Sequence, residues 1–180
     1  MSDKKSRLKE ILLEKAIKFG DFTLASGQKS SYYINCKMAT LDSEGLYLIA
    51  EMMLDKLDGV ECDAVGGLTL GADPIVGAIT ALAHCRGQKL VGFIVRKESK
   101  DHGTKSLIEG PLAEGMKVAI IEDVSTTGAS ASKAIDAAKE LGCEIIKVLV
   151  IVDRRQGAGE KFAAMNIPFD PIFRKEELGL

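Results

Sequence analysis

The segment best suited to chemistry joins four apolar residues, two carboxylates and a turn rich in hydroxyl groups. It runs from Val118 to Ser130, and its carboxylates are Glu122 and Asp123. Backbone N–H groups in such a turn, and at the start of a following helix, can bind a phosphate. Gly128 lets the backbone approach that phosphate without a Cβ in the way. Carboxylates accept hydrogen bonds from sugar hydroxyls instead, so the segment indicates a site for ribose 5-phosphate.

Two common phosphate-binding patterns are absent from this segment. No Gly-Lys-Ser/Thr follows the glycine, as it would in a Walker A loop, and the dinucleotide pattern G-x-G-x-x-G does not occur. The ordinary alternative is a helix-capping turn beside a solvated acidic pair, because Ser, Thr and Gly are common in strand-to-helix turns. The complete order of apolar, acidic and hydroxyl-bearing residues favours the sugar-phosphate site.

A basic cluster forms a second candidate site. Arg96, Lys97, Lys100 and His102 fall within seven residues, and Gly103 follows them. The stretch has no periodicity, which is typical of a long mobile loop. Cations here suit a diphosphate leaving group, whose charge grows as its bond breaks, and a closing loop shields the reactants from water. The alternative is a solvated surface loop of mixed charge.

Two further segments could take part in binding. Residues 66–74 contain three glycines and precede a predicted helix, so backbone N–H groups there could approach an anion. The alternative is a plain glycine-rich turn. Tyr32 and Tyr33 could flank a planar base, or they could belong to an aromatic strand of the core. Arg154 follows another apolar run, and its planar guanidinium can bind a carboxylate with two hydrogen bonds.

Buried strands and helices must position these residues. Apolar runs without polar alternation predict strands buried on both faces at 64–66, 90–95, 118–121 and 148–152. Helices are predicted over the first twenty residues up to Gly20, after a cap at Asp42-Ser43, and over 75–85 and 130–141. Strand-helix-strand repetition predicts an α/β fold with a central parallel sheet flanked by helices. Ligands of such sheets bind at the carboxyl ends of the strands.

Composition excludes several classes of protein. The chain has 180 residues, 46% hydrophobic and 28% charged, with a formal net charge of -2. This balance is typical of a globular protein and gives no electrostatic reason for binding nucleic acid or a membrane. No apolar stretch approaches a membrane helix, and the charged N-terminus lacks a signal core, so a cytoplasmic location is expected. Four cysteines without C-x-x-C spacing are expected to be buried, reduced thiols.

The segment 118–130 resembles the motif of type I phosphoribosyltransferases that binds 5-phospho-alpha-D-ribose 1-diphosphate (PRPP). Further matches resemble the orotate phosphoribosyltransferase family: Phe22-Thr-Leu-Ala-Ser-Gly27 with Ser30-Ser-Tyr-Tyr33, the loop Arg96-Lys-Glu-Ser-Lys-Asp-His-Gly103, and Asp153-Arg154. The resemblance implies transfer of the phosphoribosyl group from PRPP to orotate, giving orotidine 5'-monophosphate and diphosphate in pyrimidine biosynthesis. It also implies one domain over 1–180, with a small N-terminal hood at 1–40 and an α/β core at 60–155.

The resemblance implies a role for each matching residue. Lys100, His102 and Asp123 would be catalytic, and Tyr32, Tyr33, Thr126 and Arg154 would bind orotate. PRPP would be bound by Arg96, Lys97, Lys100, His102, Glu122, Asp123, Val124, Ser125, Thr126, Thr127, Gly128, Ala129 and Ser130. Mg²⁺ would be held mainly by PRPP and water, with no direct protein ligand. The basic loop would reach the site of a partner subunit, which implies a homodimer with shared sites.

The sequence departs from the family pattern at two positions. Many members carry Lys where this chain has Ala25 and Gly71. In those members the Lys at the first position contacts both substrates. Its absence leaves open how this chain balances the binding of the base carboxylate against that of diphosphate, and Lys37 is a candidate substitute. The second change leaves backbone amides as the expected donors in the glycine-rich loop.

Two other functions remain alternatives. A purine phosphoribosyltransferase would keep the motif at 118–130 but not the pairing of Arg154 with the basic loop. A regulator that binds PRPP without catalysis would add a nucleic-acid-binding module or a basic face. This chain has neither spare length nor net positive charge for one.

Overall fold

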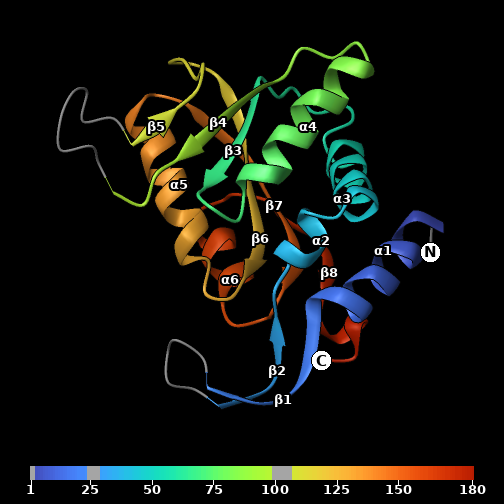
Figure 1. Ribbon diagram of the computed structural model, residues 1–180. Coiled ribbons are helices and arrows are strands. Elements are labelled where there is room, and N and C mark those ends of the chain that lie inside the picture. The colour runs from blue at the N-terminus through green and yellow to red at the C-terminus, as the bar shows by residue number, and fades with distance from the viewer. Residues whose placement is uncertain (1–2, 24–28, 99–106) are drawn as a thin grey trace.

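The computed structural model describes residues 3–23, 29–98 and 107–180, and its main feature is a six-stranded sheet (Figure 1). The strand order is β5-β4-β3-β6-β7-β8. All neighbouring strands are parallel except β4 and β5. The strands are β3 (Ala64–Leu68), β4 (Val91–Val95), β5 (Ile108–Glu109), β6 (Lys117–Ser125), β7 (Glu144–Asp153) and β8 (Phe169–Arg174). The predicted central parallel sheet is therefore confirmed.

Helices cover both faces of this sheet (Figure 1). One face is covered by α1 (Asp3–Ile11), α2 (Lys37–Thr40), α3 (Ser43–Asp55) and α4 (Asp73–Cys85), and the other by α5 (Ala129–Glu140) and α6 (Ala158–Ala164). Successive side chains of a strand point to opposite faces. Accordingly, Ala119 and Ile121 of β6 pack with the first group of helices, and Val118 and Ile120 pack with the second. This double burial explains the uninterrupted apolar runs of the sequence.

The acidic pair lies within a strand rather than after one. β6 was predicted to end at 121, but it continues to Ser125. Its register with β7 pairs Glu122 with Val150 and Ser125 with Asp153. Hydrogen bonding to a long neighbouring strand therefore carries the carboxylates inside the sheet. Only residues 126–128 separate the strand from α5, which begins at Ala129.

The N-terminal helix predicted up to Gly20 is wrong at its end. After α1, a π-helical turn (Leu12–Ala16) leads into β1 (Ile17–Thr23), which includes Gly20. β1 pairs with β2 (Lys29–Ile34) as an antiparallel hairpin, with Ile17 opposite Ile34. Phe19, which the predicted helix would include, is 66% exposed on this hairpin. Pairing with β2 satisfies the backbone and overrides the helical spacing of the apolar residues.

Other predictions concern the caps and the thiols. The cap of α3 is confirmed, because the Gly45 N–H donates to Asp42 Oδ1 at 2.9 Å. The expectation of buried, reduced cysteines holds only in part. Cys36 and Cys143 are buried, but Cys62 is half-buried and Cys85 is exposed; all four are free. None of the helices in the described part of the chain combines the length and the apolar character that crossing a membrane requires.

Candidate functional site

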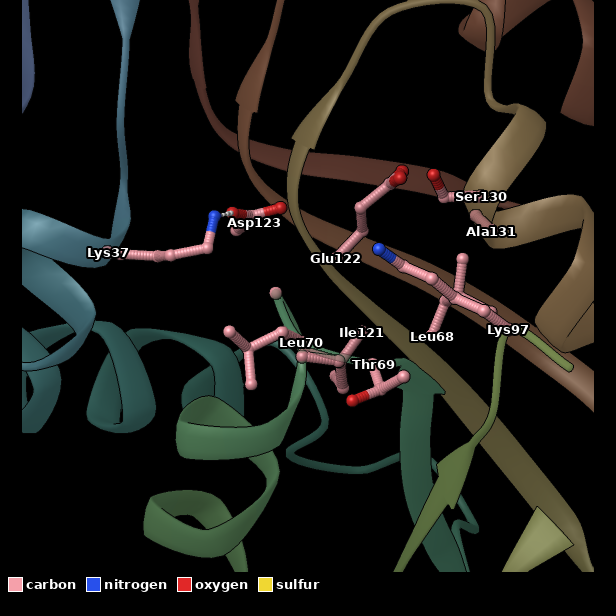
Figure 2. Close-up of a pocket in the computed structure, with 12 residues that line it drawn as sticks. Lys37, Leu68, Thr69, Leu70, Lys97, Ile121, Glu122, Asp123, Ser130 and Ala131 are labelled. Carbon is pink, nitrogen blue, oxygen red and sulfur yellow. Dashed lines mark ion pairs between the residues drawn. The ribbon is translucent and has the colours of Figure 1, made fainter.

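A pocket of about 280 Å³ opens at the carboxyl ends of β3 and β6. This is the edge of the sheet at which parallel α/β proteins bind their ligands. Figure 2 shows the acidic pair in the middle of the pocket wall, with Lys37 beside one carboxylate and Ser130 beside the other. The lining residues are Lys37, Leu68, Thr69, Leu70, Gly71, Ala72, Lys97, Ile121, Glu122, Asp123, Ser130 and Ala131.

The two carboxylates have different surroundings because neighbouring residues of a strand point to opposite faces. Glu122 is directed toward Ser130 of α5 and is only 8% exposed (Figure 2). Burial raises the pKa of Glu122 to about 7; the charge of Asp123 raises it too, while the hydroxyls of Ser125 and Ser130 oppose the change. Among the described residues, Glu122 Oε2 and Ser125 Oγ have no hydrogen-bond partner. Glu122 thus lines the pocket with a buried oxygen that has no hydrogen-bond partner.

Asp123 is the more open carboxylate of the pair. The Val124 N–H donates to its Oδ1 at 2.9 Å, which orients the group. Lys37 Nζ lies 3.9 Å from its Oδ2, and 19% of the Asp123 side chain is exposed. The remaining lone pairs can therefore accept hydrogen bonds from sugar hydroxyls in the pocket.

The turn at 126–128 and the first turn of α5 are the part of the site predicted to bind phosphate. Gly128 has φ +74, and a Cβ there would lie 2.7 Å from Phe162 Cζ of α6. The Ala158 N–H donates to Thr126 O at 3.2 Å, so α6 holds the turn at a second point. The first N–H groups of a helix have no partner within the helix and attract anions. Packing by α6 therefore holds the turn that precedes these groups.

The glycine-rich loop at 69–72 forms the facing wall. The Thr69 N–H donates to Val95 O at 2.9 Å, and its hydroxyl donates to Asp73 Oδ2 at 2.7 Å. A Cβ at Gly71 would lie 2.6 Å from Asp123 Oδ1. A side chain at position 71 would therefore have to displace the Asp123 carboxylate, and Pro74 follows in the first turn of α4.

Arg154 and Tyr32 meet at the end of β7. Arg154 Cζ lies 4.9 Å from the centroid of the Tyr32 ring, and the arginine is only 8% exposed. Within the described residues, its Nε has no hydrogen-bond partner. Tyr33 points the other way on β2 and packs on Phe22, with ring centroids 5.7 Å apart. The predicted aromatic pair is therefore divided between the two faces of the hairpin, and only Tyr32 faces the arginine.

The predicted basic residues do not all reach the pocket. Lys97 lines it, and its ammonium is directed inward from the end of β4 (Figure 2). Arg96 is instead paired with Glu109, with Nη1 3.2 Å from Oε1. Lys100, His102 and the departure at Ala25 lie outside the described residues. Arg155, the neighbour of Arg154, is exposed.

The remaining predicted residues lie in or beside the turn at 126–128, and the pocket lining includes Ser130 but none of residues 124–129. Ser125 is fully buried, Thr126 is half-buried and Thr127 is exposed. Val124 is half-buried on β6, and Ala129 is exposed at the start of α5. The sequence carries no signal that Phe162 supports this turn, because no motif lies near its helix. The contact between the Phe162 ring and Gly128 is visible only in the folded chain.

Comparison with known proteins gives concordant matches. Residues 47–169 match the family described as phosphoribosyl transferase domain. The chain is 48% identical to the orotate phosphoribosyltransferase of Thermosynechococcus vestitus, over 99% of this chain and 94% of that protein. Among solved structures, orotate phosphoribosyltransferase of Mycobacterium tuberculosis H37Rv in complex with Fe(III) dicitrate has a TM-score of 0.87 at 36% identity, covering 98% of this chain and 99% of that one. Its complex with PRPP has a TM-score of 0.83 at 33% identity, with the same coverage.

Proposed function

The chain belongs to the orotate phosphoribosyltransferase family, and from this premise we propose how its pocket performs the reaction. The enzyme transfers the 5-phosphoribosyl group from PRPP to orotate and forms orotidine 5'-monophosphate and diphosphate, a step of pyrimidine biosynthesis. The observation that carries the proposal is the juxtaposition, in one pocket, of the acidic pair with Ser130 and Ala131 of the first turn of α5. A phosphate site beside acceptors for hydroxyl groups fits the ribose 5-phosphate half of PRPP.

The residues divide between the two halves of the reaction. The turn at 126–128 and the first N–H groups of α5 would bind the 5-phosphate. Glu122 and Asp123 would accept hydrogen bonds from the ribose hydroxyls. Arg154 would bind the carboxylate of orotate with the unpartnered side of its guanidinium, and the Tyr32 ring would pack on the base.

The bond changes determine where charge must be stabilised. The C1–O bond of PRPP breaks and its electron pair leaves on diphosphate. A ring nitrogen of orotate bonds to C1 from the opposite side, which inverts that carbon, and the proton of that nitrogen passes to the departing diphosphate or to water. Positive charge develops on the sugar between these events. The carboxylates of Glu122 and Asp123 would stabilise this charge more strongly in the transition state than in bound PRPP.

Mg²⁺ is part of the proposal as a partner of PRPP. No cluster of three or more acidic, His or Cys side chains suited to a metal occurs in residues 3–23, 29–98 and 107–180. Asp123 nevertheless offers an open carboxylate beside the expected ribose hydroxyls. The ion would be held by diphosphate and hydroxyl oxygens of PRPP with water, and it would neutralise the charge of the leaving group.

Shared active sites and a cytoplasmic location complete the proposal. The basic loop of one subunit would supply Lys100 and His102 to the pocket of a partner in a homodimer. Within the described residues, the cationic side chains that line the pocket are Lys37 and Lys97. Additional cations from a partner would balance the charge of departing diphosphate.

An assay of base preference tests the proposal. Purified protein is incubated with PRPP and orotate, hypoxanthine, guanine or xanthine, with and without Mg²⁺. We expect turnover of orotate alone and a large loss of rate when the metal is chelated. Turnover of a purine without turnover of orotate would contradict the proposed base site, and an undiminished rate under chelation would remove Mg²⁺ from the mechanism.

A further inference from the structure

Lys37 brings a cation into the pocket from an element that the phosphate-binding motif does not include. It is the first residue of α2, which follows the hairpin strand β2. Its Nζ lies 3.9 Å from Asp123 Oδ2, and 44% of its side chain is exposed. This separation exceeds an ordinary hydrogen bond of about 2.7–3.2 Å. The ammonium is therefore near Asp123 without being tied to it.

The geometry of PRPP determines what would lie beside this ammonium. In the proposed function the 5-phosphate lies at the start of α5, and the ribose hydroxyls lie on Glu122 and Asp123. The diphosphate on C1 must then extend toward the opposite wall, which comprises the loop at 69–72 and Lys37 (Figure 2). That loop offers backbone groups but no cation, because its residues are Thr69, Leu70, Gly71 and Ala72. Lys37 is the cation placed to meet the diphosphate beside Asp123.

We infer that Lys37 is a diphosphate-binding residue, whose ammonium moves from the edge of Asp123 to the diphosphate oxygens when PRPP binds. The inference rests on the proposed function and adds a contact that the motif at 118–130 does not contain. Asp123 does not need Lys37 for its orientation, since the Val124 N–H already binds Oδ1. Without the ammonium, the diphosphate would face the Asp123 carboxylate with less compensation of negative charge.

Binding of three ligands separates this role from a structural one. The affinities for PRPP, inorganic diphosphate and ribose 5-phosphate are measured by calorimetry in the presence of Mg²⁺. Because a charge-assisted contact to phosphate is lost, Lys37→Ala should weaken PRPP and diphosphate binding by roughly ten- to hundredfold. Ribose 5-phosphate should bind within about twofold of the unmodified enzyme, since it lacks the diphosphate. Lys37→Arg should retain most of the affinity for diphosphate.

Controls distinguish the inference from a failure of folding or of the proposed function. Lys139→Ala removes an exposed lysine at the end of α5 and should leave all three affinities unchanged. Lys37→Gln keeps a polar side chain of similar length and should repeat the loss if Lys37→Ala unfolds. In steady state, kcat/KM for PRPP should fall while KM for orotate stays constant.

Two outcomes would overturn the inference while the proposed function stands. One is unchanged diphosphate affinity in a Lys37→Ala or Lys37→Gln enzyme that still forms orotidine 5'-monophosphate. The other is equal weakening of all three ligands, which would assign Lys37 to holding Asp123. Failure of the unmodified enzyme to use orotate would instead overturn the proposed function, and diphosphate binding would still report on Lys37.

Discussion

At the scale of single residues, two adjacent carboxylates are made different by the strand that carries them. Glu122 faces α5 and is buried, whereas Asp123 faces Lys37 and the open pocket. Glu122 therefore keeps its proton to a higher pH than an ordinary carboxyl group. The pair contributes one open acceptor and one buried group that titrates close to neutral pH.

The raised pKa of Glu122 predicts how stability depends on pH. Its pKa is 4.5 ordinarily and about 7 in the folded protein, so the folded state retains a proton that the unfolded state releases. This stabilisation is complete below pH 4.5 and is lost as the pH rises through about 7. At about 1.4 kcal/mol per pKa unit, the loss in unfolding free energy is on the order of 3 kcal/mol.

Urea unfolding of the ligand-free protein between pH 4.5 and 8 measures this effect. The unfolding free energy of the unmodified protein should fall relative to that of Glu122→Gln, whose amide does not titrate. If the unfolding free energies of the two proteins changed in parallel with pH, Glu122 would have an ordinary pKa in the folded protein.

Gly71 predicts a loss of activity with little loss of stability. Gly71→Ala places a Cβ 2.6 Å from Asp123 Oδ1 and should displace the carboxylate. We expect kcat/KM for PRPP to fall by about tenfold or more, corresponding to at least roughly 1.4 kcal/mol of lost transition-state stabilisation. Gly77→Ala is the matched control, because nothing lies within 4 Å of a Cβ there. In a helix interior it should stabilise the protein by about 0.5–1 kcal/mol. Equal activity of the two variants would show that a Cβ at position 71 does not disturb the function of Asp123.

Residue types could be predicted from the sequence, but their partners could not. The acidic pair, the hydroxyl-rich turn and Arg154 form recognisable patterns because each lies at the end of a buried strand. The separation of Tyr32 from Tyr33 depends on strand alternation, which the adjacent letters do not reveal. The position of Lys37 beside Asp123 depends on how β2 leads into α2, a contact between residues far apart in the chain.

At the scale of elements, α6 packs against the turn at 126–128, which is proposed to bind the 5-phosphate. Phe162 is fully buried, contacts the position of Gly128 and pairs with Phe169 of β8, with ring centroids 5.5 Å apart. A short helix thereby links the last strand of the sheet to the turn that would bind the 5-phosphate. The packing of this helix should therefore influence ligand affinity.

Phe162→Leu should weaken both stability and phosphate binding. Loss of buried atoms should reduce the unfolding free energy by roughly 1–2 kcal/mol. The loosened turn should also raise the Kd for ribose 5-phosphate. Phe173→Leu is the control, because Phe173 is equally buried but packs on the other face of the sheet. Calorimetry on both folded variants should show weaker binding only for Phe162→Leu; equal affinities would leave α6 without influence on the turn.

The sequence pattern predicts long central elements better than short peripheral ones. Strands β3, β4, β6 and β7 are buried on both faces and leave continuous apolar runs. β5 has two residues, and β8 contains Pro171, which argues against a strand except at the edge of a sheet. α6 has seven residues, too few for a clear helical period. These elements form through contacts with the sheet rather than through a local pattern.

At the scale of the whole molecule, the proposal of shared sites predicts complementation between inactive variants. Lys100→Ala would remove the loop function, and Arg154→Ala would remove orotate binding in the pocket. Subunit exchange in an equal mixture produces heterodimers with one intact site, so activity should recover to about a quarter of the unmodified level.

The mixture is assayed after brief exposure to mild denaturant and renaturation, which allows subunits to exchange. A double variant carrying both substitutions, mixed with either single variant, is the control and should remain inactive. Absence of recovery in the first mixture, with exchange verified by differently tagged subunits, would show that each subunit uses its own loop.

The contact between Tyr32 and Arg154 also has a consequence for how such enzymes diverge. Arg154 lies inside the region 47–169 that matches the phosphoribosyl transferase domain, whereas Tyr32 lies on the hairpin before it. The acceptor base would thus be recognised at the contact between the phosphoribosyl transferase domain and the β1–β2 hairpin that precedes it. A change of acceptor base would therefore require substitutions in both segments, at Tyr32 and at Arg154, whereas the segment 118–130 could remain the same.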